Sequence, residues 1–351
     1  MPADTSRITN KPMGGPCRLR GINMKCLFLA VLLAGVLLAG GAYRVVKKFP
    51  VPGDGGWDYL TVDSAAHRLY VSHSTQTHVL DTDTGTVVGS VPGKGVHGTA
   101  IATVVGRGFI TNGGSASVTV FDLKTLGVIA EVPVGQRPDA LLFDDATRRV
   151  YVNNAGSGTT SVIDPATAQV VGTVDIGGAL EASASDGAGH IFTNIEDKNE
   201  LVKVDVQTLK VVERWKLAPC ETPTALAIDR QNQRLFAGCR SGIMAVVDAS
   251  NGRLVATAPI GARVDAGAFD PETRTIYLSN GDGTVNLFHQ DSADKYSVVE
   301  TITTQFGAKT MALDLKSKTL YLSTADYEAA ESGSNRRRVK PGTFGVLVVS
   351  K

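Results

Sequence analysis

The sequence predicts an all-β fold, a seven-bladed β-propeller, from a repeat and from the way the repeat ends. The repeat has a period of about 42 residues and holds four short strands rich in β-branched residues, which is the pattern of a propeller blade. Gly, Asp and Asn turns separate the strands, and the pattern excludes helical solenoids. An aromatic residue in each second strand marks the seven repeats: Tyr70, Phe109, Tyr151, Phe192, Phe236, Tyr277 and Tyr321.

The four strands of a repeat differ in pattern. The first is a frame that begins with a polar residue and continues through apolar or small positions, as in residues 58–63 and 265–270. The second carries the aromatic residue, and the third ends in Asp in five repeats. The fourth is a β-branched run such as VVGTV at 170–174. Four such strands with turns between them predict one blade.

The two ends of the repeat region predict how the ring closes. The seventh repeat has strands near 311–315, 320–323 and 344–349 and lacks a fourth. The segment 44–53 matches the fourth strands of other repeats, yet it precedes the first repeat. We therefore expect it to complete the last blade, which removes the exposed edges of an open sheet. Residues 43–351 are predicted to form one propeller domain.

Residues 1–42 have the character of an export signal region. Met24 and Lys25 precede an apolar run at 27–40, and small residues lead to Ala42. This pattern predicts a signal peptide that starts at Met24 and is cleaved near Ala42, and hence a periplasmic or secreted protein. The alternative is an uncleaved anchor, because the run is only slightly shorter than a bilayer span. Membrane attachment is expected in that case alone.

The overall composition excludes few functions. The chain is 43% hydrophobic and 20% charged, has a formal net charge of +1 and contains 38 glycines, as turn-rich all-β proteins do. Without a basic bias, nucleic acid is not an expected partner, and the protein is expected to be a monomer. The sequence lacks a Gly-x-Ser-x-Gly nucleophile elbow, a phosphate-binding loop and a His-Glu-x-x-His element. It therefore identifies no catalytic residue.

Two cysteines remain once the signal region is removed. Cys17 and Cys26 lie within residues 1–42, whereas Cys220 precedes the first strand of the fifth repeat and Cys239 ends its second strand. Because these strands are antiparallel, both cysteines are expected on one rim, where an exported protein forms disulfides. The alternative is two separate thiols that fill small gaps. A metal site made from two cysteines alone is not expected.

One repeated position points to a functional site. The first strands of a propeller are innermost, so the residues that begin them are expected to surround the mouth of the central channel. This channel-mouth ring is a predicted ligand-binding site, and the alternative is a set of solvated or backbone-capping residues without a ligand. Its members are Asp58, His97, Asp139, Glu181, Thr224, Asp265 and Lys309.

Part of the ring is chemically suited to a metal ion. Carboxylates with an imidazole favour Ca²⁺ or Mg²⁺, or Zn²⁺ or Mn²⁺ if the imidazole converges with two carboxylates. Lys309 opposes a simple metal cage, because its ammonium is expected to pair with a neighbouring carboxylate or to orient an anionic substrate group. The candidate ligands are Asp58, His97, Asp139, Glu181 and Asp265.

The seventh repeat carries a long insertion between its second and third strands. It spans residues 325–342 and is expected on the same rim as the channel-mouth ring. Its polarity is typical of a loop that is disordered when free. With a ligand present, we expect it to fold over the channel mouth as a lid, with arginines that contact a carboxylate or phosphate. The residues that carry this expectation are Tyr327, Arg336, Arg337 and Arg338.

Three second strands carry a resemblance to a known family. VYVNN (150–154), GFITN (108–112) and IYLSN (276–280) resemble the Tyr-Val-Thr-Asn repeat of the YVTN, or YncE-like, β-propeller family. The resemblance covers residues 43–351 and implies a propeller in an exported or cell-surface protein, without a defined activity. The propeller hydrolases of the gluconolactonase type are a more distant analogue. They hold a divalent ion at the channel mouth, but their ligand motifs are not matched here residue by residue.

These features lead to three functional hypotheses. The preferred one is an exported binding protein that holds a small polar ligand, a peptide or an envelope protein at the channel-mouth rim. The second is a metal-dependent hydrolase or lyase of lactone- or sugar-like substrates at the same place. The third is an inert structural platform. The sequence favours a role without catalysis, because it locates no nucleophile.

Overall fold

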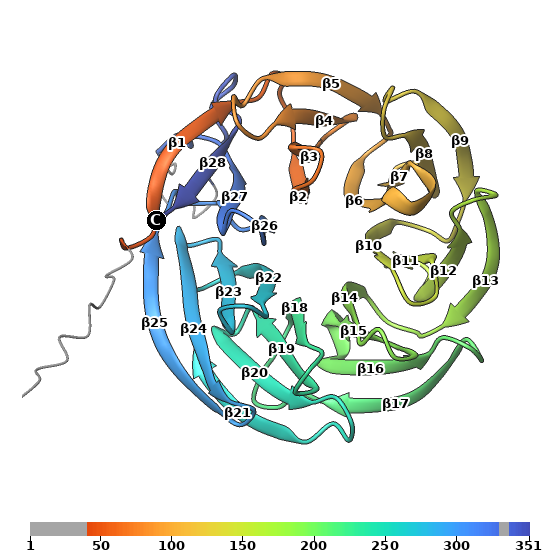
Figure 1. The fold of residues 1–351 in the computed structure, drawn as a ribbon, viewed down its shortest axis with the longest axis vertical. Helices are drawn as coiled ribbons and strands as arrows, with labels where there is room; N and C mark the ends of the chain where they lie inside the picture. The colour runs from red at the N-terminus through yellow and green to blue at the C-terminus, as the bar shows by residue number, and fades with distance from the viewer. Residues whose placement is uncertain (1–40, 330–336) are drawn as a thin grey trace, which may run out of the picture. The chain divides into compact units, whose positions relative to one another are not determined.

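The propeller predicted from the repeat is confirmed. The structure is a computed structural model that describes residues 41–329 and 337–351. Contacts divide the chain into Met1–Gly40 and Gly41–Lys351, so the predicted signal region lies almost entirely outside the described residues. The second unit is a ring of seven four-stranded antiparallel sheets (Figure 1). The first strands of neighbouring sheets contact one another around the ring and are therefore innermost.

Each sheet is described here from its innermost strand outward. The first three are β2 (Trp57–Asp63), β3 (Arg68–His73), β4 (Gln76–Asp81), β5 (Val87–Pro92); β6 (Val96–Ala102), β7 (Arg107–Asn112), β8 (Ser117–Asp122), β9 (Val128–Pro133); and β10 (Pro138–Asp144), β11 (Arg149–Asn154), β12 (Thr159–Asp164), β13 (Gln169–Asp175). The next two are β14 (Leu180–Ser185), β15 (His190–Ile195), β16 (Glu200–Asp205), β17 (Lys210–Lys216); and β18 (Pro223–Asp229), β19 (Arg234–Cys239), β20 (Ile243–Asp248), β21 (Leu254–Pro259). The last two are β22 (Val264–Asp270), β23 (Thr275–Asn280), β24 (Thr284–Ser292), β25 (Lys295–Thr303); and β26 (Met311–Asp314), β27 (Thr319–Thr324), β28 (Gly345–Ser350), β1 (Arg44–Pro50). Short 3₁₀ helices, η1 (Thr103–Val105) and η2 (Glu196–Lys198), follow β6 and β15.

The N-terminal strand closes the ring, as predicted. β1 pairs antiparallel with β28, from Arg44 opposite Ser350 to Pro50 opposite Gly345. Phe49 on this strand is 3% exposed and belongs to a hydrophobic cluster built from the first and seventh blades. Backbone pairing thus completes the seventh blade, so that β28 has no open edge over the paired length, and core packing joins this blade to the first.

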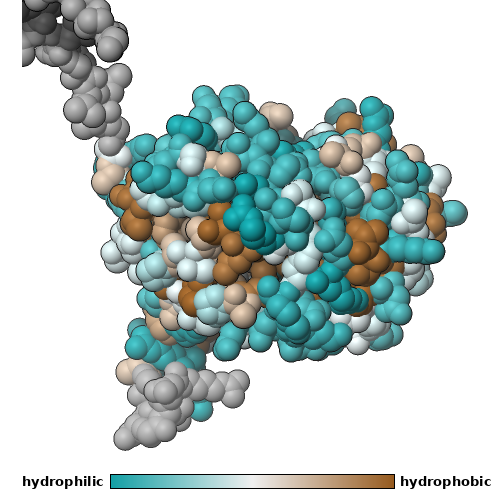
Figure 2. Space-filling model, turned by 90° about the horizontal axis from the view of Figure 1, so that it is seen from below, coloured by the Kyte–Doolittle hydropathy of each residue, from teal (hydrophilic) through white to brown (hydrophobic). Residues whose placement is uncertain are grey.

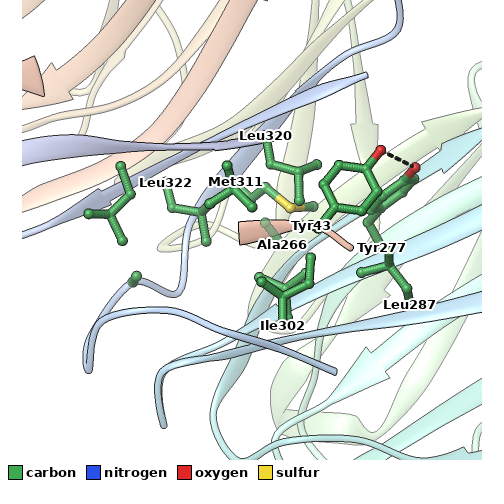
Figure 3. Packing of buried hydrophobic residues seen from close by; sticks show 12 residues of the cluster. Tyr43, Ala266, Tyr277, Leu287, Ile302, Met311, Leu320 and Leu322 are labelled. Atoms are coloured by element: carbon green, nitrogen blue, oxygen red, sulfur yellow. Dashed lines mark hydrogen bonds between the residues drawn. The ribbon is translucent and has the colours of Figure 1, made fainter. Parts of the chain in front are cut away.

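The residue before β1 extends this closure to the sixth blade. Tyr43 is buried in a cluster with Tyr277, Leu287 and Leu320 (Figure 3). The hydroxyl oxygens of Tyr43 and Tyr277 lie 3.2 Å apart, so one hydroxyl donates a hydrogen bond to the other. A buried phenol needs such a partner, because an unpaired hydroxyl in an apolar environment is destabilising.

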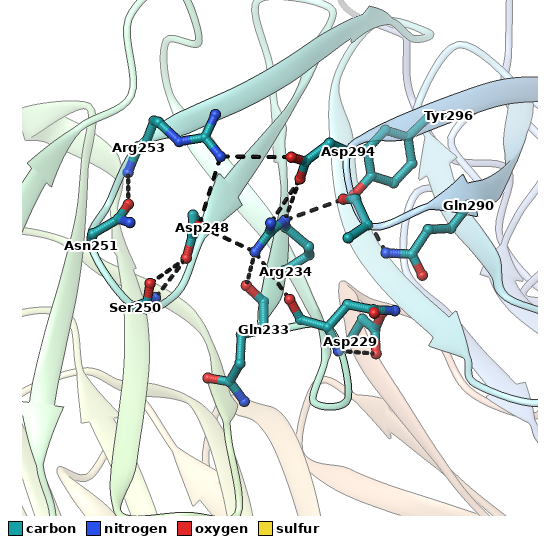
Figure 4. A network of polar contacts seen from close by, with 12 residues as sticks. Asp229, Gln233, Arg234, Asp248, Ser250, Asn251, Arg253, Gln290, Asp294 and Tyr296 are labelled. Atoms are coloured by element: carbon teal, nitrogen blue, oxygen red, sulfur yellow. Dashed lines mark hydrogen bonds and ion pairs between the residues drawn. The ribbon is translucent and has the colours of Figure 1, made fainter.

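Polar side chains also fasten neighbouring blades. Arg234, at the start of β19, is buried and lies between the fifth and sixth blades (Figure 4). Its guanidinium is 2.7 Å from Oδ1 of Asp294, in the turn between β24 and β25, and 3.3 Å from Oδ2 of Asp248 on β20. A buried guanidinium is tolerated when carboxylates pair with it in this way, and the pairing links the two blades at this end of the sheets.

The aspartate that ends most third strands has a structural role. Oδ1 of Asp122 accepts the backbone N–H groups of Lys124, at 3.0 Å, and Thr125, at 2.7 Å. These hydrogen bonds, with that from Thr125 foremost, favour the ionised form and lower the pKa of Asp122. The same pair of bonds recurs at Asp81, Asp164 and Asp205. This acidic column therefore holds turns in place.

The exposed apolar residues lie mostly on the outermost strands. Val88, Ile129, Val171 and Val299 are examples from four blades. On the face drawn in Figure 2, apolar side chains form small patches separated by hydrophilic ones. Scattered residues of this kind are ordinary on protein surfaces and do not define a docking site. Within residues 41–329 and 337–351, no helix is long and apolar enough to cross a membrane.

The predicted disulfide is present in the fifth blade. Cys220 and Cys239 are joined, with their Cα atoms 5.6 Å apart. Both residues are fully buried. Because Cys239 ends β19 and Arg240 follows it, the bridge also anchors the backbone beside the channel mouth. The bond closes a loop with a sequence separation of 19 residues.

Replacing both cysteines by alanine is expected to lower the free energy of unfolding by about 2–4 kcal/mol, because the unfolded chain regains the freedom that the bridge removes. Urea unfolding of the wild-type protein, with and without reductant, and of the Cys220→Ala/Cys239→Ala variant measures the effect. The free energy of unfolding of the reduced wild type should be closer to that of the variant than to that of the oxidised wild type. Equal stability of the oxidised wild type and the variant would count against the bridge.

Candidate functional site at the mouth of the central channel

The residues of the channel-mouth ring are positioned by hydrogen bonds between blades. The hydroxyl of Thr111 on β7 donates to the carbonyl oxygen of Asp139 at 2.6 Å, and the amide of Asn153 on β11 donates to that of Glu181 at 2.6 Å. Ser279 on β23 donates to the carbonyl oxygen of Lys309 at 2.5 Å. A polar residue in the second strand of one blade thus fixes the first strand of the next, which holds the ring side chains in place.

The structure brings three ring residues together on the side of the first three blades. Nδ1 of His97 lies 2.6 Å from Oδ2 of Asp58 and 3.6 Å from Oδ1 of Asp139. The hydrogen bond to Asp58 raises the pKa of His97. Burial, and then the negative charge of Asp58, raise the pKa of Asp139 to about 6. We call this group the Asp-His-Asp cluster.

Glu181 lies apart from this cluster and contacts a residue inside the channel. Tyr59 on β2 donates a hydrogen bond from its hydroxyl to Oε2 of Glu181, at 3.4 Å. Burial raises the pKa of Glu181 to about 9, together with the charge of Asp139 and a hydrogen bond with Glu196. Burial and the charges of surrounding carboxylates, Asp139 first among them, raise the pKa of Tyr59 as well. Both groups are therefore held in their neutral forms at neutral pH.

Glu181→Gln is expected to stabilise the propeller toward alkaline pH. The folded-state pKa of Glu181 lies above its ordinary value of 4.5, so the wild type loses stability as the pH rises from 4.5 toward about 9. Gln cannot ionise and avoids this loss, which predicts an advantage of about 2–4 kcal/mol near pH 9 that shrinks toward pH 4.5. Urea unfolding at pH 5, 7 and 9 measures it, with the exposed Glu221→Gln as the control. A difference that does not vary with pH would refute the burial argument.

Charges alternate on the opposite side of the mouth. Nζ of Lys309 lies 2.7 Å from Oδ2 of Asp265, which confirms the predicted pairing of this lysine with a carboxylate. Arg240 bridges Asp265, at 3.3 Å, and Glu196, at 2.6 Å. Burial lowers the pKa of Lys309, but Asp265 outweighs burial and the net pKa is raised. Asp265 is thus already neutralised by two cations, and the structure does not bring it into the Asp-His-Asp cluster.

Thr224 contributes no free hydroxyl to the ring. Its side chain is fully buried and donates a hydrogen bond to the carbonyl oxygen of Val264, at 2.7 Å. The contact joins β18 to the start of β22, so it links the first strands of two neighbouring blades. Thr224 therefore has a structural role, which is the alternative that the sequence left open for ring positions.

A pocket of about 850 Å³ opens beside the ring over the fifth, sixth, seventh and first blades. Asp265 and Lys309 form part of its wall, and Asp54 is a second carboxylate. Its cations outnumber its carboxylates by four to two, so the lining is net positive. Pockets of this size bind small organic molecules. We call it the rim pocket; its cations are Arg240, Arg263, Lys309 and Arg337, and its aromatic residues are Trp57, Phe306 and Tyr327.

Two guanidinium groups contact the same aromatic ring in the rim pocket. The guanidinium carbons of Arg263 and Arg337 lie 4.6 Å and 4.5 Å from the ring centre of Phe306. Among the described residues, neither group forms an ion pair with a carboxylate, in contrast to Arg240. Tyr327 meets Phe306 edge-on, with 5.2 Å between ring centres. Two cations next to one apolar wall provide donors for an anionic group attached to a planar body.

The described arms of the insertion in the seventh blade form part of this pocket. Tyr327 and Val339 form an antiparallel bridge, and the N–H of Gly342 donates to Oδ1 of Asp54 at 2.8 Å. Gly307 has φ +83° and leaves space for the ring of Tyr327, because a Cβ there would lie 2.4 Å from the tyrosine hydroxyl. Arg338 is described but does not line the pocket, and Arg336 lies outside the described residues. Tyr327 and Arg337 thus line the rim pocket together with the ring residues Asp265 and Lys309.

Trp57 has two roles at the candidate site. Its ring stacks on Phe344 with 5.2 Å between ring centres, and it packs against the cluster between the first and seventh blades. It also lines the rim pocket and lies 6.5 Å from Tyr327, ring centre to ring centre. The residue therefore seals the seam between these blades and forms one wall of the pocket.

Several site residues were missed by reasoning from the sequence. Arg240 and Phe306 lie in connections between strands, where no repeated pattern singles them out. Arg263 stands two residues before Asp265, at a position that Gly, Ala, Thr or Arg occupies in the other repeats, so the repeat gives no signal for it. The sequence gives a clearer signal for Tyr59 than for Arg263. The other six frames carry Gly98, Ala140, Ala182, Ala225, Ala266 and Thr310 at its position.

Comparisons with solved structures agree with the fold. A chain of hydrazine synthase from Kuenenia stuttgartiensis matches with a TM-score of 0.65 and 18% identity, over 78% of this chain and 94% of that chain. U3-55K matches with a TM-score of 0.73 and 12% identity, over 88% of this chain and 98% of that chain. A chain of the mitotic checkpoint complex matches with a TM-score of 0.71 and 14% identity, over 90% of this chain and 95% of that chain. No protein-family model and no curated protein matches the sequence. At these identities the likeness shows the fold alone.

Proposed function

We propose that the protein is a binding protein that holds a small organic anion in the rim pocket. The observation that carries this proposal is the pair of guanidinium groups of Arg263 and Arg337 on Phe306, without a carboxylate partner among the described residues. Guanidinium groups form strong, charge-assisted hydrogen bonds with carboxylate and phosphate groups. A ligand with such a group would supply the negative charge that both guanidinium groups lack.

The aromatic lining favours a ligand with a planar or apolar body. Trp57, Phe306 and Tyr327 offer ring faces and edges, while Lys309 and Arg240 extend the positive charge toward the channel mouth. Lys309 and Arg240 already pair with Asp265, so they set the local potential more than they supply free donors. A carboxylate or phosphate on an aromatic ring matches both halves of the pocket.

The proposed setting is the periplasm or the extracellular space. The export signal pattern at residues 1–42 and the resemblance to YVTN-repeat propellers support this location and membership of that family. The disulfide between Cys220 and Cys239 is compatible with an oxidising compartment. A net charge of +1 with a locally positive pocket favours a small anion over nucleic acid.

The proposal is tested by thermal unfolding in the presence of matched ligands. Phenyl phosphate and phenylacetate are compared with the uncharged benzyl alcohol and phenylacetamide. The two anions are expected to raise the melting temperature, because a ligand that binds only the folded state stabilises it. The uncharged analogues are expected to have little effect, and 0.5 M NaCl should weaken the shift by screening.

Sodium chloride at matched ionic strength is the control for general salt effects. A melting-temperature shift that is equal for the anions and for their uncharged analogues would contradict an anion site. The absence of any shift with either anion at millimolar concentrations would contradict the proposed ligand class.

A further inference from the structure

We propose that the Asp-His-Asp cluster is a binding site for one divalent transition-metal ion, Zn²⁺ or Mn²⁺. The site uses Nδ1 of His97 and one carboxylate oxygen each from Asp58 and Asp139. It does not depend on the rim pocket or on the organic anion proposed for it. The mixed ligand set selects the class of ion, because an imidazole favours Zn²⁺ and carboxylates accept Zn²⁺ or Mn²⁺.

The distances between the three ligand atoms allow them to coordinate one metal ion after a small movement. The three ligand atoms all lie within 4.8 Å of one another. Bonds of about 2.1 Å in a tetrahedral site separate ligand atoms by about 3.4 Å. The 3.6 Å between His97 and Asp139 already meets this requirement, and the 2.6 Å hydrogen bond between His97 and Asp58 must open by less than 1 Å, to about 3.4 Å.

A buried oxygen in the cluster lacks a partner. Oδ1 of Asp139 is inaccessible to solvent and has no hydrogen-bond partner among the described residues, while it faces Nδ1 of His97 at 3.6 Å. An unsatisfied carboxylate oxygen in this position is unfavourable. A metal ion at the centre of the cluster would satisfy it.

The nearby lysine and arginine side chains do not neutralise the carboxylates of the Asp-His-Asp cluster. Lys309 carries the ammonium group of the channel-mouth ring. This group lies 2.7 Å from Asp265, on the other side of the mouth. Arg240 is likewise engaged by Glu196 and Asp265. Two carboxylates thus face one imidazole without a further ion pair to a lysine or arginine among the described residues, and this surplus of negative charge favours a divalent cation.

The backbone of the cluster is fixed before an ion binds. The hydroxyl of Thr111 accepts the N–H of Gly98 at 2.8 Å and donates to the carbonyl oxygen of Asp139 at 2.6 Å. The hydroxyl of Thr61 donates to the carbonyl oxygen of Thr99 at 2.6 Å. These bonds tie β2 to β6 and β6 to β10, so the three ligands are presented from strands whose spacing is set by the propeller. Such support improves metal affinity.

The test is calorimetric titration of tag-free, chelator-treated protein with Zn²⁺, and electron paramagnetic resonance titration with Mn²⁺. We expect one ion per chain for at least one of the two metals, and a higher melting temperature with the ion than with chelator. Asp139→Asn and His97→Gln are expected to weaken binding at least about tenfold. Circular dichroism identifies any variant that fails to fold, and Asp58→Asn provides a third probe of the same site.

His190→Gln is the matched control, because His190 pairs with Asp186 at 2.8 Å without belonging to a three-ligand cluster. This variant should bind the ion as the wild type does. Absence of stoichiometric binding of both metals by the folded wild type would overturn the proposal. Unchanged affinity in the folded Asp139→Asn and His97→Gln variants would overturn it as well, since the ion would then lie elsewhere.

Discussion

Deletion of residues 43–52 is expected to destabilise the entire propeller, with a fall in melting temperature of more than about 10 °C. The deletion removes β1 and with it the pairing to β28 from Arg44 to Pro50. It also removes Phe49 and Tyr43, which pack between blades. Loss of a buried phenylalanine alone is worth about 3–5 kcal/mol. Because each blade is packed against the next, an opened ring is expected to lose stability at every seam.

Point variants on β1 separate the effect of packing from that of chain length. Phe49→Ala should lower the free energy of unfolding by about 3–5 kcal/mol. Val46→Ser, on the same strand but 43% exposed, should change it by less than about 0.5 kcal/mol. Thermal and urea unfolding measure both. A deletion variant that melts at the wild-type temperature would show that the strand is dispensable for closure.

The second large effect is expected for the two arginines of the rim pocket. Arg263→Gln combined with Arg337→Gln should weaken the binding of phenyl phosphate at least tenfold, because each charge-assisted hydrogen bond contributes about 1.5–3 kcal/mol. Both side chains are exposed at the surface, so the stability of the fold should hardly change. Isothermal titration calorimetry measures the affinity.

Arg274→Gln is the matched control for this pair. Arg274 lies between β22 and β23, at the end of the sheets opposite the channel mouth, and its exposed guanidinium is remote from the rim pocket. The control should bind phenyl phosphate with wild-type affinity. If the double variant and the Arg274→Gln control weaken binding equally, the attraction is a general effect of charge. If the double variant binds as tightly as the wild type, the site lies elsewhere.

The fold was predictable because its information is repeated along the chain. The second-strand aromatics, of which Tyr70 and Tyr151 are examples, recur at one period and are all buried in the sheets. The closing strand was found by counting strands, since the seventh repeat lacked one and the segment before the first repeat supplied it. The channel-mouth ring could be located in the same way, because its residues occupy one repeated position at the start of each first strand.

The site was predictable only in part, because its chemistry is not repeated. Strand order placed His97 and Asp139 on adjacent blades, but their convergence depends on side-chain directions that no pattern in the sequence encodes. Thr224 matched the ring by position, yet its hydroxyl is used for a bond between blades. Arg240 and Phe306 lie in individual loops and meet only through the closed ring, so that a single blade's sequence contains no sign of the pocket.

The most direct test of the central claim, an anion site in the rim pocket, is a crystal structure of the protein soaked with phenyl phosphate. The phosphate is predicted to contact the guanidinium groups of Arg263 and Arg337, with the phenyl ring against Trp57 or Tyr327. Phenyl phosphate bound at another surface, or an empty rim pocket at a concentration that raises the melting temperature, would contradict the account.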